Sequence, residues 1–280
     1  RSPREKAAPT RQRASTRPTK KWQLCRLGAL FALLAFSSCR PNSDAKPKLI
    51  IYAAASLTEV VEALTAAFDS QQAYQIHSNF AGSGALAKQL IAAQKADLFL
   101  SANPQWMQAL VQAGRISPDA PRNFLSNRLC LIAHPNADFS VKSSDEIDSL
   151  NFQYLALGDP TYVPAGVYAQ QWLSSVADES GTSLWQQVKD QLLPTTDVRA
   201  VIGAVAASAK VIGIVYQTDY LAAQSRVQLL YTLPESEAPA IHYQATALNT
   251  RAVNQDFLEF LNSETAHAIF ESHGFISPTR

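Results

Sequence analysis

The stretch LIIYAAASLTEVVEALTAAF, residues 49–68, decides the fold class because it joins a buried strand to a one-sided helix. Leu49–Tyr52 is a short apolar run, which predicts a strand covered on both faces. From Ser56 to Phe68 apolar residues recur every three or four positions, which predicts a helix with one buried face. The apolar positions are Leu57, Val60, Val61, Leu64 and Phe68. A strand followed by a helix is the first unit of a parallel sheet with helical crossovers.

The same alternation continues along the chain. Further strands are expected at residues 74–79, 98–100, 128–133, 154–157, 211–216, 227–231 and 242–248. Further helices are expected at residues 85–94, 103–114, 166–176, 198–209, 254–262 and 264–272. Asn103 and Pro104 have the residue types of an N-cap and a first helical position, and Gly114 that of a helix end. The pattern predicts two α/β lobes, each a mainly parallel sheet flanked by helices.

No internal repeat or low-complexity linker separates the two lobes. We expect crossings between lobes near Asn127 and near His242, with the last helices returning to the first lobe. Residues 48–127 and 242–280 then form lobe 1, and residues 128–241 form lobe 2. Two lobes joined in this way are typical of a binding protein that closes over its ligand in the cleft.

Charge is divided unevenly along the 280 residues. Residues 1–48 hold 12 basic and 2 acidic residues, a net of 12 − 2 = +10. Residues 49–280 hold 12 basic and 21 acidic residues, a net of 12 − 21 = −9. An acidic body argues against nucleic acid as the partner. Three cysteines are too few for the disulfide framework of a small secreted protein.

The basic segment has the features of an export signal. The run LGALFALLAF, residues 27–36, is uncharged but too short to span a bilayer, and Lys20, Lys21 and Arg26 precede it. The following FSSC, residues 36–39, resembles the lipobox of bacterial lipoproteins, in which the cysteine becomes the lipidated first residue. We expect residues 1–38 to be a leader and signal peptide, Cys39 the lipid anchor, and residues 39–47 a tether. The alternative is an ordinary signal cut nearby. In contrast, Cys130 lies in an apolar run and is expected in the core.

Five strand-to-helix turns carry the candidate binding residues, because ligands of α/β sheets bind at the carboxyl ends of strands. Helix starts there present free N–H groups and a positive dipole end to anions. Ser56 with Glu59 predicts a capping box, and the alternative to a binding role is that the serine serves only as that cap. In FAGSGALAK, residues 80–88, two glycines allow close backbone approach and Ser83 offers a hydroxyl.

The other three turns offer backbone and phenol donors. In GDPTYVPAGVY, residues 158–168, Pro164 lacks an N–H, so the next free donors are those of Ala165 and Gly166. Asp197 is expected to cap a helix that begins at Val198. Tyr216 ends a strand and can donate through its phenol.

These segments together resemble one family. The matching stretches are AAASLT (53–58), FAGSGALAKQL (80–90), ADLFLSANPQWMQAL (96–110), GDPTYVPAGVYA (158–169), DVRAVIGAV (197–205), GIVYQTDY (213–220) and IFESHGF (269–275). In this order and spacing they resemble the molybdate-binding proteins of bacterial molybdenum ABC transporters, which are type II periplasmic binding proteins. The resemblance implies a two-lobed fold and a site that holds an oxyanion through two serine hydroxyls, backbone N–H groups and a tyrosine.

Carried over to this sequence, the implied binding residues are Ser56, Ser83, Ala165, Val198 and Tyr216. Gly82 stands where the family often has another serine, so only one hydroxyl is expected in that turn. The implied ligand is molybdate or tungstate, with no cofactor and no site for a bare metal cation. The implied partner is the membrane permease of the transporter. We expect an exported monomer, anchored as a lipoprotein in the periplasm or at the cell surface.

The residue types agree with such a ligand, and three alternatives stay open. Molybdate carries no proton at neutral pH, so donors alone can bind it, whereas monoprotonated phosphate would need an acceptor. No Lys or Arg lies in the serine, VPAG or GIVY turns, and the Arg199 side chain is expected to point elsewhere. Sulfate is another dianion of this kind. An enzyme is disfavoured because none of the five histidines lies in the five turns. The export signal disfavours a ligand-sensing regulator.

Overall fold

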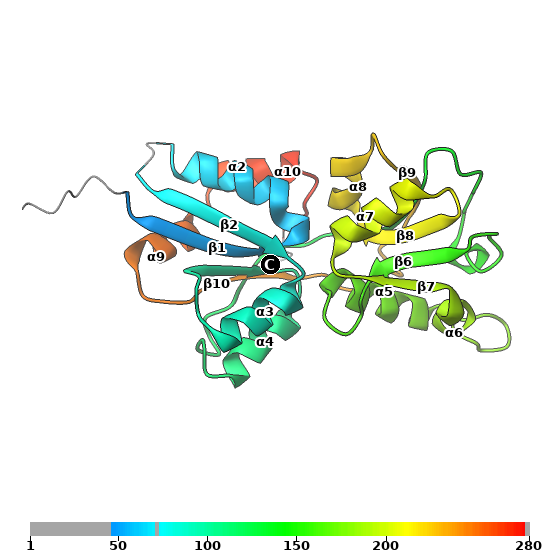
Figure 1. Ribbon diagram of the computed structural model, residues 1–280, viewed down its shortest axis with the longest axis horizontal. Helices are drawn as coiled ribbons and strands as arrows, with labels where there is room; N and C mark the ends of the chain where they lie inside the picture. Colours follow the sequence, from blue (N-terminus) through cyan, green and yellow to red (C-terminus); the bar gives the residue numbers. More distant parts are fainter. Residues whose placement is uncertain (1–45, 71–72, 278–280) are drawn as a thin grey trace, which may run out of the picture. The chain divides into compact units, whose positions relative to one another are not determined.

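The structure, a computed structural model, describes residues 46–70 and 73–277 (Figure 1). The predicted leader and Cys39 lie outside these residues. The described part contains two five-stranded sheets, and helices lie on both faces of each sheet (Figure 1). Within these residues, none of the helices combines the length and the apolar character that crossing a membrane requires.

The first sheet has the strand order β2-β1-β3-β10-β4. Its strands are β1 (Lys48–Ala54), β2 (Gln75–Ala81), β3 (Leu98–Ser101), β4 (Arg122–Leu125) and β10 (Tyr243–Ala247). Strands β2, β1 and β3 are parallel, while β10 runs antiparallel to both of its neighbours. The carboxyl ends of β1, β2 and β3 therefore meet at one edge of the sheet.

Helices cover both faces of the first sheet because its strands β1 and β3 carry apolar residues on both sides. They are the 3-10 turn η1 (Ala55–Leu57) and helices α2 (Thr58–Phe68), α3 (Ser83–Ala92), α4 (Pro104–Gln112), α9 (Ala252–Phe260) and α10 (Glu264–Ser272). Along β3, Leu98 and Leu100 pack in the same core as α2, α9 and α10, whereas Phe99 packs with α3 and α4. Figure 1 shows α2 and α10 on one face and α3 and α4 on the other.

The second sheet repeats this pattern with the order β7-β6-β8-β5-β9. Its strands are β5 (Leu129–Ala133), β6 (Tyr154–Gly158), β7 (Leu192–Thr195), β8 (Val211–Tyr216) and β9 (Gln228–Thr232). Strands β7, β6 and β8 are parallel, and β5 is antiparallel to β8 and β9. Each sheet thus has three parallel strands whose carboxyl ends meet, next to one reversed strand.

Helices pack on both faces of the second sheet, so its core has two layers. They are α5 (Pro164–Ser175), α6 (Leu184–Val188), α7 (Val198–Ala207) and α8 (Gln217–Ala223), with the 3-10 turns η2 (Ser144–Glu146) and η3 (Lys189–Gln191). Trp172 of α5 packs with Ile212 and Ile214 on one face. Val201 and Val205 of α7 pack with Cys130 on the other, and Cys130 is fully buried as predicted.

The chain passes between the sheets twice. It leaves the first sheet after β4 and enters the second at β5, and it returns between β9 and β10. In both cases the strand by which it enters is the reversed one. The residues between Leu125 and Leu129, and between Thr232 and Tyr243, are therefore the connections between the two sheets.

Every strand and helix predicted above is present with small shifts at its ends, and one local prediction is wrong. The expected capping box at Ser56 does not form, because residues Ala55–Leu57 make a 3-10 turn and α2 begins at Thr58 without a side-chain cap. The Ser56 hydroxyl is paired elsewhere, as described below. At Asn103 the predicted cap is confirmed, since its side chain accepts from the Gln105 amide. The elements β4, β7, α6 and α8 were not predicted.

The packing of α7 on β8 requires a glycine at one point. A Cβ atom on Gly213 would lie 2.7 Å from Cγ1 of Val201 and 2.7 Å from Cγ2 of Val205. Gly203, within α7 itself, has no atom within 4 Å of the corresponding position. An added methyl group therefore meets a packed core at Gly213 and open space at Gly203.

We expect Gly213→Ala and Gly203→Ala to change stability in opposite directions. Overpacking should lower the free energy of unfolding of Gly213→Ala by roughly 1–3 kcal/mol. Loss of backbone freedom in the unfolded chain should raise that of Gly203→Ala by roughly 0.5–1 kcal/mol. Urea unfolding followed by circular dichroism measures both. Equal stability of Gly213→Ala and the wild type would contradict the described packing of α7.

Candidate functional site

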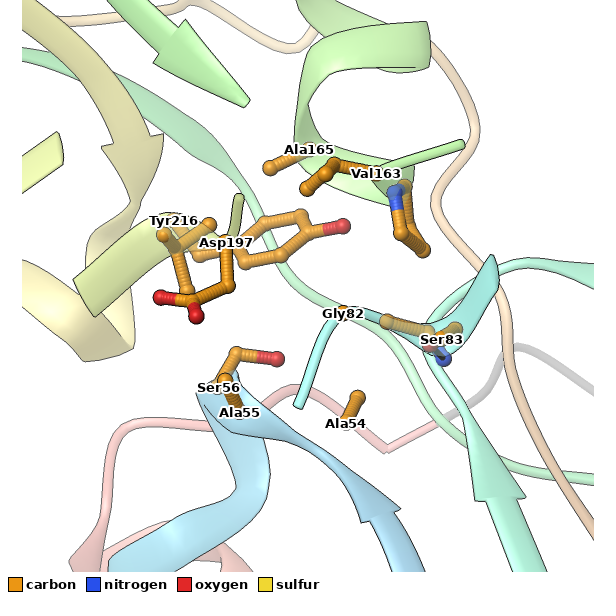
Figure 2. Close-up of a pocket in the computed structure, with 12 residues that line it drawn as sticks. Ala54, Ala55, Ser56, Gly82, Ser83, Val163, Ala165, Asp197 and Tyr216 are labelled. Atoms are coloured by element: carbon orange, nitrogen blue, oxygen red, sulfur yellow. Dashed lines mark hydrogen bonds between the residues drawn. The ribbon is translucent and has the colours of Figure 1, made fainter. Parts of the chain in front are cut away.

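A small pocket lies where the carboxyl ends of parallel strands from both sheets meet (Figure 2). It is lined by Ala54, Ala55, Ser56, Gly82, Ser83, Ala102, Val163, Pro164, Ala165, Asp197, Val198 and Tyr216. Its enclosed volume is about 10 Å³, far below the roughly 300–1,000 Å³ typical of sites for drug-sized ligands. Three other cavities in the described residues have enclosed volumes of about 280 to 350 Å³. The size of this pocket favours a small ion.

Helix starts from both sheets face this pocket. Ser56 lies in the turn before α2, Ser83 is the first residue of α3, Ala165 the second of α5 and Val198 the first of α7. The first N–H groups of a helix have no partner within the helix, and its dipole is positive at this end. Among the described residues, the N–H groups of Ala165 and Val198 have no acceptor. The pocket is therefore suited to a negative ligand.

Ser83 is fully buried, and its hydroxyl is oriented by the neighbouring strand end. Its Oγ accepts a hydrogen bond from the Ala102 amide at 3.1 Å. Because this bond uses an acceptor site of the hydroxyl, the proton of Ser83 stays available for a ligand in the pocket.

Ser56 is oriented by a chain of hydrogen bonds that the sequence did not indicate. Its Oγ lies 3.1 Å from Oη of Tyr243, and that Oη accepts from Nδ2 of Asn127 at 3.2 Å. Nδ2 of Asn127 also donates to Oγ1 of Thr218 at 2.9 Å. With Asn127 donating to it, the Tyr243 phenol can donate its own proton to Ser56, which leaves the Ser56 proton for the pocket.

Tyr216 supplies a donor that lacks a protein partner. Its side chain is 1% exposed, and its Oη has no hydrogen-bond partner in the described part of the chain. Burial, with the nearby phenols of Tyr243 and Tyr168, raises the pKa of Tyr216 well above its ordinary value, so the phenol stays protonated. Figure 2 shows this oxygen directed toward the space enclosed by Ser56, Ser83 and Ala165. A buried unpaired hydroxyl at this place indicates that an acceptor belongs there.

Neutral groups line the pocket almost entirely. Within the described residues no lysine, arginine or histidine lines it, and the one carboxylate is that of Asp197. Oδ1 of Asp197 accepts from the amides of Arg199 and Ala200, so this residue caps α7 as predicted. The Arg199 side chain does not line the pocket either. It contacts the carbonyl oxygen of Ala55 and the carboxylates of Glu59 and Asp219.

The structure brings all five residues expected to bind the ligand to this one pocket. The expected close backbone approach at Gly82 is also present, since a Cβ there would lie 2.8 Å from the carbonyl oxygen of Thr196. Ser56 and Ser83 have no histidine partner within the described residues, so the geometry gives no support for a nucleophilic serine. In residues 46–70 and 73–277, no three His, Cys, Asp or Glu side chains are grouped to hold a metal ion.

Asp219, in the first turn of α8, is fully buried beside Arg199. Oδ1 of Asp219 lies 3.4 Å from Nε of Arg199. Burial raises the pKa of Asp219 to about 7, although the Arg199 charge acts in the opposite direction. The carboxylates of Glu59 and Asp197 also raise it. Between about pH 4 and pH 7 the folded protein therefore binds a proton at this residue that the unfolded chain does not.

We expect the stabilising contribution of Asp219 to be complete below pH 4 and to be lost as the pH rises through about 7. The neutral side chain of Asp219→Asn removes this dependence. The variant should accordingly gain stability relative to the wild type as the pH rises from about 4.5 to 7.5. Urea unfolding at several pH values measures the difference, in which the titration of groups that do not interact with Asp219 cancels. A difference that does not change with pH would show that Asp219 has an ordinary pKa.

Known proteins are similar to this chain in sequence. The model of the bacterial extracellular solute-binding protein family matches residues 49–276. The molybdate-binding protein ModA of Escherichia coli K12 is 32% identical over 251 residues, which cover 87% of this chain and 95% of that protein. A Bacillus subtilis protein, YvgL, named as a candidate ABC transporter substrate-binding lipoprotein, is 31% identical over 257 residues, with 89% of this chain and 96% of that protein covered.

Solved structures share the fold. The periplasmic molybdate-binding protein of Azotobacter vinelandii has a TM-score of 0.70 at 18% identity, covering 82% of this chain and 100% of that one. The sulfate-binding protein SubI of Mycobacterium tuberculosis has a TM-score of 0.71 at 13% identity, covering 82% and 87%. The family match over most of the chain, together with the two lobes and the pocket between their strand ends, shows that this chain belongs to the bacterial extracellular solute-binding proteins, with the fold of the type II periplasmic binding proteins.

Proposed function

We propose that this protein captures molybdate outside the cytoplasm and delivers it to the membrane permease of an ABC transporter. The observation that carries the proposal is the set of neutral donors that converge on one small pocket without a cation. The relatives add support, because the Escherichia coli protein is named for molybdate binding. Tungstate has the same charge and shape and is proposed as a second ligand.

In this proposal the five donors each contact an oxygen of the anion. Ser56 and Ser83 donate through hydroxyls whose acceptor sites are used by protein groups. Tyr216 donates through a phenol that burial keeps protonated. Ala165 and Val198 donate through backbone N–H groups at helix starts. Because the lining side chains exclude water, each hydrogen bond to the charged anion is stronger than it would be in solution.

Proton content separates phosphate from molybdate in this pocket. Monoprotonated phosphate would bring a donor, and Oδ1 of the one lining carboxylate, Asp197, already accepts two amides. Sulfate is a second candidate, because it is also a proton-free dianion and because the sulfate-binding protein SubI shares the fold. Hydrogen-bond type cannot separate sulfate from molybdate, so the size of the closed pocket must do so.

We further propose that the protein is exported with residues 1–38 as leader and signal and is held at a membrane through lipid on Cys39. The apolar run at residues 27–36 and the FSSC segment support this, as does the lipoprotein description of the Bacillus subtilis relative. Residues 48–127 with 242–280, and residues 128–241, are proposed as the two lobes that close on the anion. The closed unit would act as a monomer.

Calorimetric titration with four anions tests the ligand assignment. We expect molybdate and tungstate to bind tightly, sulfate weakly and phosphate not at all, each added to anion-free protein in chloride buffer. Phosphate binding as tight as that of molybdate would contradict a donor-only pocket. Tighter binding of sulfate than of molybdate would replace the proposed ligand by the second candidate.

Ser56→Ala and Ser83→Ala each remove one side-chain donor. A hydrogen bond to a charged group contributes roughly 1.5–3 kcal/mol, so we expect molybdate affinity to fall by roughly one to two orders of magnitude in each variant. Ser149→Ala is the control, because Ser149 is exposed and bonds only to the carbonyl oxygen of Glu146. Wild-type affinity in both pocket variants would place the binding site elsewhere.

Val198→Pro tests a backbone donor without changing any charge. Proline is tolerated at the first position of a helix, and the extended backbone of Asp197 is compatible with a following proline. Loss of the Val198 N–H should weaken molybdate binding by roughly tenfold or more. Ala252→Pro, at the first position of α9 and away from the pocket, is the matched control and should bind normally. Equal binding by the two variants would exclude the Val198 N–H as a ligand donor.

A further inference from the structure

Tyr162 of the second lobe inserts into the first lobe beside the pocket. Its carbonyl oxygen accepts a hydrogen bond from the Gly84 amide at 3.1 Å. Its ring packs against the first-lobe cluster that contains Trp106, and Nζ of Lys88 lies 5.3 Å from the ring centre. A Cβ on Gly84 would lie 2.3 Å from the Tyr162 carbonyl oxygen, so this approach depends on the glycine. We name this set of interactions the Tyr162 contact.

Arg199 of the second lobe makes a separate connection to the first lobe. Its Nε donates to the carbonyl oxygen of Ala55 at 3.3 Å, and its guanidinium pairs with the carboxylate of Glu59. Within its own lobe Nε of Arg199 lies 3.4 Å from Oδ1 of Asp219, which is fully buried. The guanidinium is therefore fixed from its own lobe while it holds a backbone oxygen of the other. We name this set the Arg199 contact.

Both contacts involve residues that are close in sequence to the proposed ligand donors. The side chains of Tyr162 and Arg199 themselves do not line the pocket. Gly84 follows Ser83, and Tyr162 precedes the α5 start that carries Ala165. Similarly, Arg199 follows Val198 and holds the carbonyl of Ala55, the residue before Ser56. Each contact thus fixes a donor of one lobe against a donor of the other. An anion held by donors from two lobes is released only when these lobes separate.

We propose that Tyr162 and Arg199 are positioning residues that hold the two lobes together around the bound oxyanion and so set the rate of its release. The inference rests on the function proposed above. The two contacts share no residue, so their effects on release should be independent. They act after the anion has entered, so the rate of association should change little.

The test is the release of radioactive molybdate from loaded full-length protein, diluted into an excess of unlabelled molybdate. A cation–π contact or a partly exposed ion pair contributes little, so we expect Tyr162→Ala and Arg199→Ala each to release molybdate roughly two- to fivefold faster. The double variant should show the product of the two factors. Association rates, measured in parallel by stopped flow, should stay within about twofold of the wild type.

Conservative and charge-matched variants separate positioning from general damage. Tyr162→Phe keeps the ring and the carbonyl and should release molybdate at the wild-type rate. Arg226→Ala removes a positive charge from an exposed position of the same lobe, outside any ion pair formed among the described residues, and should also behave as wild type. If Arg226→Ala releases molybdate as fast as Arg199→Ala does, and faster than the wild type, the effect is one of long-range charge. That result would overturn the role of Arg199.

The outcomes distinguish this inference from the function on which it rests. If the wild type retains molybdate but Tyr162→Ala and Arg199→Ala release it at the wild-type rate, the positioning role is wrong and the proposed function stands. If the wild type does not retain molybdate, the proposed function is wrong and this inference fails with it. Slower association with unchanged release would also overturn the inference, because the residues would then act on entry.

Discussion

A doubly charged anion must be held here without a counter-charge, and the rest of the structure follows from that constraint. Hydroxyl, phenol and amide groups each carry only a partial positive charge, so several must converge on one small volume. Parallel strands whose carboxyl ends meet, each followed by a helix start, bring such groups together. One sheet supplies Ser56 and Ser83, and the other supplies Ala165, Val198 and Tyr216. Neither lobe alone has the complete set of donors.

The residues that orient these donors lie at the connections between the sheets. Asn127 is in the first connection, and Tyr243 begins the strand after the second. Asn127 donates to the Tyr243 phenol, which in turn bonds to Ser56. A motion at either connection therefore changes the orientation of a ligand donor. The glycines at positions 82 and 84 let the backbone of the second lobe, at Thr196 and Tyr162, approach the first. Ligand contact and lobe position are thus coupled through hydrogen bonds and close packing.

Much of this arrangement could be predicted from the sequence because the signals are local. Apolar runs and helical periodicity indicated the strands and long helices, and the family resemblance indicated five of the twelve residues that line the pocket. Short elements such as β4 and α6 carry too few residues for a clear period. The capping prediction at Ser56 failed because a tertiary partner, Tyr243, lies 187 residues away in the sequence. For the same reason no local pattern indicated the hydrogen bonds of Asn127 or the interlobe contacts of Tyr162 and Arg199.

The most direct test of a pocket built from neutral donors is a crystal structure with molybdate, with the metal located by anomalous scattering at the molybdenum edge. We expect one strong peak between Ser56, Ser83 and Tyr216, with the oxyanion oxygens about 2.7–3.1 Å from these hydroxyls and from the N–H groups of Ala165 and Val198. The Arg199 guanidinium should still hold Ala55 and point away from the anion. A molybdenum peak elsewhere, or a lysine or arginine side chain in contact with the anion, would contradict it.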